Sequence, residues 1–265
     1  MTSNTSHLPP YLQVALNSDP GRPRLTYYDD ATGERVELSA QTLANWVTKT
    51  MNLLVQDVDV EERTRVSLHL PLHWLTAVWI IAADAVGTPV SADDLGPSGE
   101  APAGFDHQGA MYSSIYGSVH VTQSDHTDDP DAAFAVSLAP MAQPLGARCP
   151  AHLRDFLADV RTMPDQLVVA PERASLLADR VALRATELGL AAHDRVATLA
   201  PEGAASVEDL IQGVLAPLQA DGSAVWTRHA DLALCAARWQ QEHVTSVFGP
   251  VPAEVQQQGH IRVLS

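Results

Sequence analysis

The sequence predicts an α/β fold made of two related units, each a parallel sheet covered by helices. The first observation is a repeated phrase, because RVSLHLP at 65–71 returns almost unchanged as RVATLAP at 195–201. The second is the order of elements around each copy, where helical periodicity and short β-prone runs alternate with short connections. Such alternation is typical of parallel strands joined by helices that cover the sheet.

We expect the first unit to occupy 1–150, with an irregular insertion at 92–132, and the second to occupy 151–265. The two units would pack as one compact body. The insertion is rich in Gly, Ser, Pro and Asp, which favour turns and loops over regular elements. Two repeats of this length are too few for a solenoid, so the repetition indicates a duplicated α/β unit.

In the first half, an irregular N-terminal stretch leads into a hairpin and a helix. The hairpin is predicted at 25–38, where β-prone residues flank an Asp/Gly turn. The helix is predicted at 39–56, where Ser39 can act as the cap and apolar residues recur at helical spacing. The remaining elements are a strand at 65–70, a buried helix at 73–86 that stops at Gly87, and strands at 88–92, 118–123 and 133–141.

The second half repeats this order after a connecting loop, helix and loop at 143–172. Gly189 and Gly222 mark the ends of two helices, and Pro201 stops a strand. The predicted elements are helices at 172–190, 206–221 and 231–243, and strands at 195–200, 223–227, 244–249 and 260–265.

Composition narrows the class of partner. The chain has 265 residues, is 46% hydrophobic and 18% charged, and carries a formal net charge of −16. Such acidity argues against nucleic acids and anionic membranes as partners. The two cysteines form neither a disulfide framework nor a metal-ligand spacing. The N-terminus lacks a secretory signal, and the longest apolar run, at 77–90, is too short to span a bilayer. We therefore expect a soluble, cytoplasmic protein.

Candidate ligand-binding residues follow the two copies of the repeated phrase. His73 and Trp74 lie beyond the end of the first strand, where open parallel sheets bind ligands. Glu202 and Gly203 hold the matching place in the second unit, and Gly249 follows a later strand. His69 and His73 have the spacing of helical metal pairs, but Pro71 lies between them, so packed or solvated histidines are the simpler interpretation.

Other chemistry-bearing features favour ordinary structural roles. The acidic loop at 125–131, with histidines nearby, lacks the positional pattern of a calcium loop, which favours a solvated loop. Cys149 precedes a proline, and no neighbouring base supports a catalytic thiol. The five tryptophans fall on element faces and are expected in the core. We predict no catalytic residue, no metal and no cofactor.

Several stretches resemble the N-terminal part of the adenylate-forming enzymes, the superfamily of acyl-CoA synthetases, luciferases and nonribosomal adenylation domains. The stretches are RVSLHLP and AVGTPVS at 85–91 in the first half, and LGLAAHDRVATLAP at 188–201, VLAPLQADGSAVW at 214–226 and HVTSVFGPVP at 243–252 in the second. The resemblance implies the fold of that N-terminal domain, without its β-barrel and C-terminal lid. The chain is most similar to a short actinobacterial branch of unassigned activity.

The sequence departs from the family where the family does its chemistry. The resemblance places a Ser/Thr/Gly-rich phosphate-binding loop, ending in lysine, just before Arg173. Here the stretch at 163–175 reads MPDQLVVAPERAS, without glycine, threonine or lysine, and its two prolines lack a backbone donor. Lys49, the single lysine, is expected on the surface of the first helix. The family's C-terminal domain, with its catalytic lysine, is expected to be absent.

These observations lead to three hypotheses about function. The first is a non-catalytic relative of the AMP-forming ligases that binds a small acyl or nucleotide ligand or another protein. The second is one half of a split adenylate-forming ligase, completed by a second polypeptide. The third is a homodimeric structural or scaffolding protein. The sequence itself does not choose a substrate or partner among them.

Overall fold

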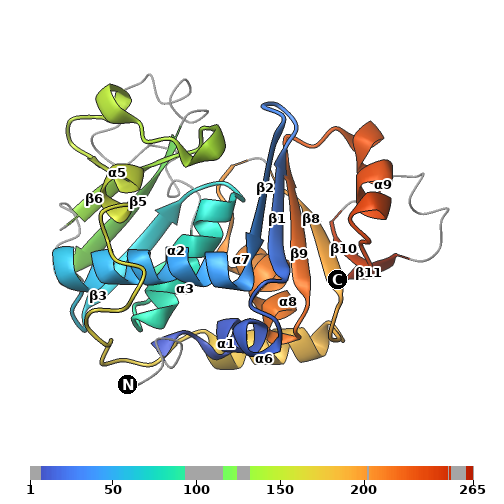
Figure 1. The fold of residues 1–265 in the computed structure, drawn as a ribbon, viewed down its shortest axis with the longest axis horizontal. Coiled ribbons are helices and arrows are strands. Elements are labelled where there is room, and N and C mark those ends of the chain that lie inside the picture. Colours follow the sequence, from blue (N-terminus) through green and yellow to red (C-terminus); the bar gives the residue numbers. More distant parts are fainter. Residues whose placement is uncertain are drawn as a thin grey trace. The chain divides into compact units, whose positions relative to one another are not determined.

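A computed structural model describes residues 7–92, 116–123, 132–201, 203–249, 251 and 261–264 of the chain (Figure 1). The fold is α/β with two sheets, as predicted. The chain divides into two compact units, 1–44 with 177–201 and 208–265, and 45–176 with 202–207. This division differs from the expected 1–150 and 151–265, because the first strands pair with strands from the end of the chain.

The first unit contains a six-stranded sheet in the order β11-β10-β8-β9-β1-β2. Its strands are β1 (Pro23–Asp29), β2 (Glu34–Ser39), β8 (Arg195–Leu199), β9 (Ser223–Arg228), β10 (Ser246–Phe248) and β11 (Arg262–Leu264). Its helical segments are α1 (Pro10–Ser18), α6 (Ala178–Glu187), α7 (Val207–Leu210), η5 (Ile211–Leu215), α8 (Ala216–Gln219) and α9 (Leu232–Gln241). The sheet is parallel except for β2, which pairs antiparallel with β1 in the predicted hairpin.

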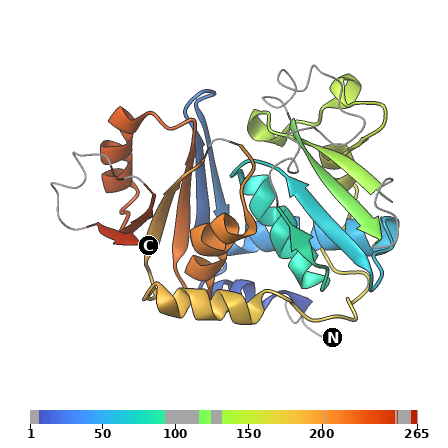
Figure 2. The ribbon, with the colours of Figure 1, turned by 180° about the vertical axis from the view of Figure 1, so that it is seen from behind.

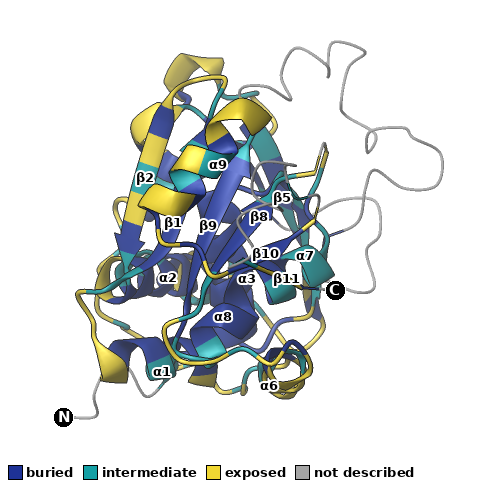
Figure 3. Cartoon of the chain, turned by 90° about the vertical axis from the view of Figure 1, so that its right-hand side faces the viewer, coloured by how far each residue is buried: buried dark blue, intermediate teal, exposed yellow. Residues whose placement is uncertain are grey.

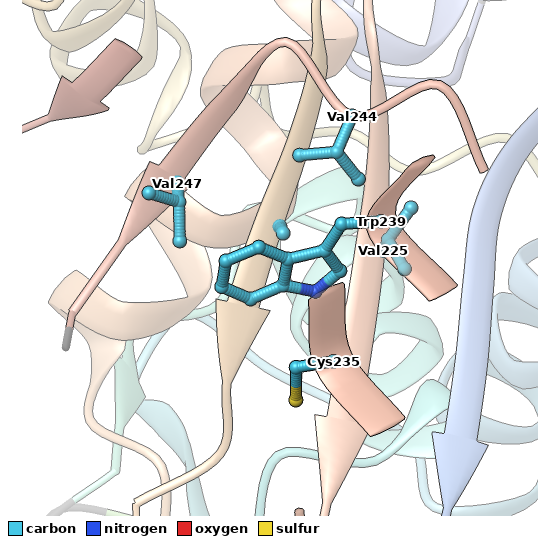
Figure 4. Packing of buried hydrophobic residues seen from close by; sticks show 6 residues of the cluster. Val225, Cys235, Trp239, Val244 and Val247 are labelled. Carbon is cyan, nitrogen blue, oxygen red and sulfur yellow. The ribbon is translucent and has the colours of Figure 1, made fainter. Parts of the chain in front are cut away.

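Helices cover both faces of this sheet, and the alternation of side chains along β8 shows how. Val196 packs with residues of α6 and α8, whereas the next residue, Ala197, packs with α9. Successive side chains of a strand point to opposite faces, so α9 lies opposite α6 and α8. Trp239 of α9 fills the centre of its cluster (Figure 4), and α8 crosses the other face of the strands (Figure 2).

The N-terminal stretch, which was expected to be irregular, forms helix α1. Pro10 is the first residue of the helix. The backbone N–H that proline lacks would have no partner within the helix at this position, so proline removes no hydrogen bond there. Tyr11, Leu12 and Ala15 are buried. The Arg24 side chain, also fully buried, donates to the Ala15 carbonyl at 3.1 Å and thereby fixes the helix to β1.

The second unit contains a five-stranded sheet in the order β4-β3-β5-β6-β7. Its strands are β3 (Thr64–His69), β4 (Val90–Ser91), β5 (Tyr116–Gln123), β6 (Ala132–Ser137) and β7 (Arg154–Asp155). Its helical segments are the end of α2 (Ala40–Asn52), η2 (Leu53–Asp57), α3 (Trp74–Ala85), η3 (Pro140–Ala142), η4 (Gly146–Arg148) and α5 (Phe156–Val160). Contrary to the prediction of a purely parallel sheet, β5 runs antiparallel to both β3 and β6.

The repeat predicted from the two phrases is architectural. RVSLH lies in β3 and RVATL forms β8, and each is an interior strand of its own sheet. Each is followed by helix and then by a parallel neighbour: β3 pairs with β4, and β8 pairs with β9. The two phrases therefore mark the same β-α-β element in the two units.

Three aromatic rings hold the centre of the second unit together. Trp79 of α3 lies 4.7 Å from Phe156 of α5 and 5.5 Å from Phe134 of β6, measured between ring centroids. All twelve residues of α3 are buried, whereas exposed residues alternate with buried or half-buried ones along β2 in the first unit (Figure 3). Within the described ranges, no helix is both long and apolar enough to cross a membrane.

Candidate functional site

His73 and Trp74 begin helix α3 in the second unit. His73 is the helix cap, and its Nδ1 accepts a hydrogen bond from the Leu75 amide at 3.2 Å. Only 1% of His73 and 3% of Trp74 is exposed. The Trp74 ring packs edge-on against Trp46, with 5.3 Å between centroids. Both residues therefore have structural tasks at the start of α3, and a ligand-binding role for them stays a prediction.

Gly203 and Gly249 are both exposed and both have positive φ, of 97° and 92°. The turn that contains Gly203 belongs to the second unit, where the Ala205 amide donates to the Leu70 carbonyl at 2.8 Å. Gly249 follows β10 in the first unit. The structure thus brings His73, Trp74 and Gly203 into one unit and places Gly249 in the other. Glu202 lies outside the described residues.

The histidines of the second unit make ring contacts. His69 of β3 packs edge-on against His120 of β5, with 5.4 Å between ring centroids. Burial, together with the charges of His69 and His152, lowers the pKa of His120 to about 4, so its ring is neutral at physiological pH. In the described part of the chain, no group of three or more His, Cys, Asp or Glu could hold a metal ion. The acidic loop 125–131 lies outside that part.

Cys149 is half-buried, and its Sγ lies 3.4 Å from the Leu153 carbonyl oxygen. Burial raises the pKa of its thiol, and the carboxylates of Asp155 and Asp159 raise it further. A raised pKa disfavours the nucleophilic thiolate. This environment agrees with the prediction that Cys149 is not a catalytic thiol.

The stretch at 163–176, which we call the anchored segment, is fixed to the second unit by side chains from several elements. The Lys49 ammonium group donates to the Met163 carbonyl at 2.7 Å and is partly buried. The expectation that Lys49 is a solvated surface residue is therefore wrong. Its aliphatic stem can pack along α2 while the charged end reaches a backbone acceptor.

Asn52, at the end of α2, makes three hydrogen bonds to the anchored segment. Its Nδ2 donates to the carbonyls of Pro164 and Gln166, each at 2.9 Å. Its Oδ1 accepts from the Val168 amide at 3.1 Å. Asn52 is 1% exposed, so water does not replace these partners in the folded protein.

Asp84 fixes the other end of the anchored segment from within helix α3. Its fully buried carboxylate accepts from the Ser175 hydroxyl at 2.6 Å and from the Leu176 amide at 2.7 Å. Hydrogen bonds to a buried carboxylate are among the strong ones. In the sequence Asp84 appears only as a charged residue inside an apolar run. In the structure its carboxylate fixes the anchored segment to α3.

Arg173 ties the anchored segment to two loops of the same unit. Its guanidinium donates to the carbonyls of Glu61 at 2.6 Å, Gly87 at 3.3 Å and Val60 at 3.4 Å. At Gly87, where φ is +67°, a Cβ would lie 2.4 Å from the Arg173 Cβ. Glycine is therefore required both by the backbone conformation and by the closeness of Arg173.

The anchored segment is poorly suited to hold phosphate. A phosphate-binding loop needs backbone amides directed at the ligand. Here the amides of Val168 and Leu176 already donate to Asn52 and Asp84, and the prolines at 164 and 171 have none. These two amides and two prolines therefore offer no donor to an anion.

A pocket of about 600 Å³ lies beside the anchored segment, entirely within the second unit. We call it the acidic pocket. Its lining consists of Val55, Asp59, Val60, Glu61, Glu62, Val86, Val169, Ala170, Pro171, Glu172 and Arg173. The four carboxylates are on exposed residues, whereas the single cation, Arg173, donates to backbone carbonyls. The charge balance of the acidic pocket is negative.

Comparison with known proteins places the chain in a family. It is 35% identical over 256 residues to a TIGR03089 family protein of Mycobacterium tuberculosis, an alignment that covers 94% of this chain and 100% of the relative. This chain belongs to the TIGR03089 family. No family model matched the chain.

Solved structures share the fold of this TIGR03089 family member. An acyl-CoA synthetase of Brucella canis matches 95% of the chain with a TM-score of 0.61 and 13% identity. The acetoacetyl-CoA synthetase of Streptomyces lividans matches 96% with a TM-score of 0.58 and 13% identity. A fatty acyl-adenylate ligase of L. pneumophila, solved with acyl adenylate and pyrophosphate, matches 94% with a TM-score of 0.54 and 10% identity.

The TIGR03089 family member spans about half the length of these structures, 49%, 50% and 45% respectively. The predicted resemblance to the adenylate-forming enzymes is confirmed at the level of the fold. Sequence reasoning located the departure at 163–175 but missed what holds it. For Asp84, the charge within a predicted buried helix was a signal that the residue has a specific partner. Nothing in the sequence indicated that Asn52 and Lys49 bind the anchored segment.

Proposed function

We propose that this protein is a non-catalytic relative of the AMP-forming acyl-CoA synthetases, acting as a binding or partner protein. The observation that carries the proposal is the anchored segment. It occupies the place where the resemblance puts the phosphate-binding loop, and its amides at Val168 and Leu176 donate to side chains of the protein itself. Reaction of ATP with a carboxylate requires donors and cations that offset phosphate charge.

The charges beside the anchored segment support the same proposal. The acidic pocket has four carboxylates, and its single arginine donates to backbone carbonyls. The single lysine of the chain, Lys49, donates to the Met163 carbonyl and holds the segment in place. An anionic nucleotide approaching this surface meets repulsion rather than a compensating charge.

The test is exchange of radiolabelled pyrophosphate into ATP, driven by acetate or by medium-chain and long-chain fatty acids. An active acyl-CoA synthetase assayed in parallel serves as the positive control. We expect exchange no greater than in a reaction without protein. Exchange that depends on both the protein and a carboxylate would refute the proposal.

A split adenylate-forming ligase is the second candidate, favoured by the match to about half of each acyl-CoA synthetase structure. The anchored segment weighs against it, because the half present here would still have to supply the phosphate-binding loop. Purification from native extract tests this candidate. Recovery of a stable complex that carries out the exchange would favour the split ligase over the non-catalytic role.

A further inference from the structure

The acidic pocket combines apolar walls, which are exposed at Val169 and Ala170, with a charged rim. Its walls are formed by Val55, Val60, Val86, Val169, Ala170 and Pro171. Val169 is 48% exposed, and Val168 beside it is 58% exposed. Apolar side chains gathered at a hollow and rimmed by polar groups mark an interaction site more often than an isolated exposed residue does.

The rim of the acidic pocket carries charges that the protein does not compensate. The carboxylates of Asp59, Glu61, Glu62 and Glu172 make no hydrogen bond or ion pair with any part of the chain that the structure describes. The guanidinium of Arg173 donates to backbone carbonyls and forms no ion pair with these four carboxylates. Four carboxylates thus face solvent around an apolar hollow.

This combination of charge and surface limits what can bind. Nucleotides, fatty acids and acyl-CoA are anions, so the rim disfavours them. A second copy of this chain brings a net charge of −16 of its own. The complementary occupant has positive charges next to apolar groups.

We infer that the acidic pocket is a docking surface for a segment of a partner protein in which arginine or lysine stands next to an apolar side chain. The inference rests on the proposed role as a partner protein and names the chemistry of that partner. The apolar side chain would enter between Val60 and Val169, and the cations would lie along the rim at Glu61, Glu62 and Glu172. Complementary charges of this kind set specificity and the rate of association.

The probe is a fluorescein-labelled synthetic peptide in which arginine alternates with leucine, added to the full-length protein and followed by fluorescence anisotropy. A peptide with citrulline in place of arginine controls for apolar adsorption. The triple variant E61Q/E62Q/E172Q removes three of the four carboxylates of the rim. The matched control E37Q/D179N/E187Q removes the same charge from the first unit, outside the acidic pocket. V169S tests the apolar wall.

We expect saturable binding of one arginine peptide per chain, weakened about tenfold in the rim variant and less than about twofold in the control variant. V169S should also weaken binding, and unchanged circular dichroism and thermal unfolding would show that each variant is folded. Equal losses in the two triple variants, binding that does not saturate, or no effect of V169S would each overturn the inference. So would equally tight binding of free arginine amide, which would assign the pocket to a small cation. Peptide binding tests this inference and pyrophosphate exchange tests the proposed function, so a negative result in one assay does not decide the other.

Discussion

Replacing Asn52 by alanine tests whether the anchored segment is held by the contacts described above. The substitution removes three hydrogen bonds: two that Asn52 donates to the carbonyls of Pro164 and Gln166, and one that it accepts from the Val168 amide. Each neutral hydrogen bond contributes about 0.5–1.5 kcal/mol. We therefore expect the free energy of opening the segment to fall by about 1.5–4.5 kcal/mol.

Hydrogen exchange measures this loss directly. A fall of about 2 kcal/mol corresponds to roughly 30-fold faster exchange of amides protected by the closed segment. The Val168 amide loses its acceptor in N52A, so the informative amide is that of Leu176, which donates to Asp84 and keeps its acceptor. Faster exchange at Leu176 would show that the segment opens as one unit.

The matched control is Gln56→Ala, which changes an exposed residue close to Asn52 in sequence. We expect exchange in the anchored segment to be unchanged in Q56A. Exchange at Leu176 within about twofold of the original protein in N52A would refute the reasoning, because it would show that the three hydrogen bonds of Asn52 do not stabilise the closed segment.

Two further predictions concern the stability of each unit. Gly87→Ala places a Cβ 2.4 Å from the Arg173 Cβ at a φ of +67°, so we expect a loss of about 1–3 kcal/mol and a lower urea midpoint; an unchanged midpoint would contradict the close approach. Although burial would raise the pKa of Glu242, hydrogen bonds from Tyr28, Arg195 and Arg35 hold it below its usual value. The lowered pKa of Glu242 stabilises the folded protein above the pKa of the unfolded state, about 4.3. This stabilisation is lost as the pH falls through the pKa that Glu242 has in the folded state. Glu242→Gln should therefore be less stable in urea at neutral pH and approach the original protein below about pH 4, and a difference that does not change with pH would show that ionisation of Glu242 is not involved.

Local signals in the sequence were sufficient to predict most helices and strands of the fold. The Asp/Gly turn produced the hairpin of β1 and β2, and Ser39 caps α2 by accepting from the Thr42 amide at 3.1 Å. Gly87, with positive φ, ends α3 as predicted. Each signal concerns residues within one turn of one another, which is the range over which a single sequence is informative.

Long-range features were not predictable in the same way. Side chains alternate with the same period in parallel and antiparallel strands, so the pattern at 118–123 could not show that β5 runs antiparallel to β3. Helix α1 was missed because Pro9 and Pro10 indicated an irregular start, although proline fits the first turn. Asn52 binds a carbonyl 114 positions away, and no local pattern indicates which carbonyl will accept.

The pairing of β1 with β9 has a consequence for synthesis of the protein. Leu25 is in register with Ala224, so β1 is synthesised long before the neighbour with which it pairs. Until then β1 can pair only with β2, and an isolated hairpin is marginally stable. The nascent chain therefore carries an open strand edge until β9 has been made, and chaperones and aggregation compete for such edges.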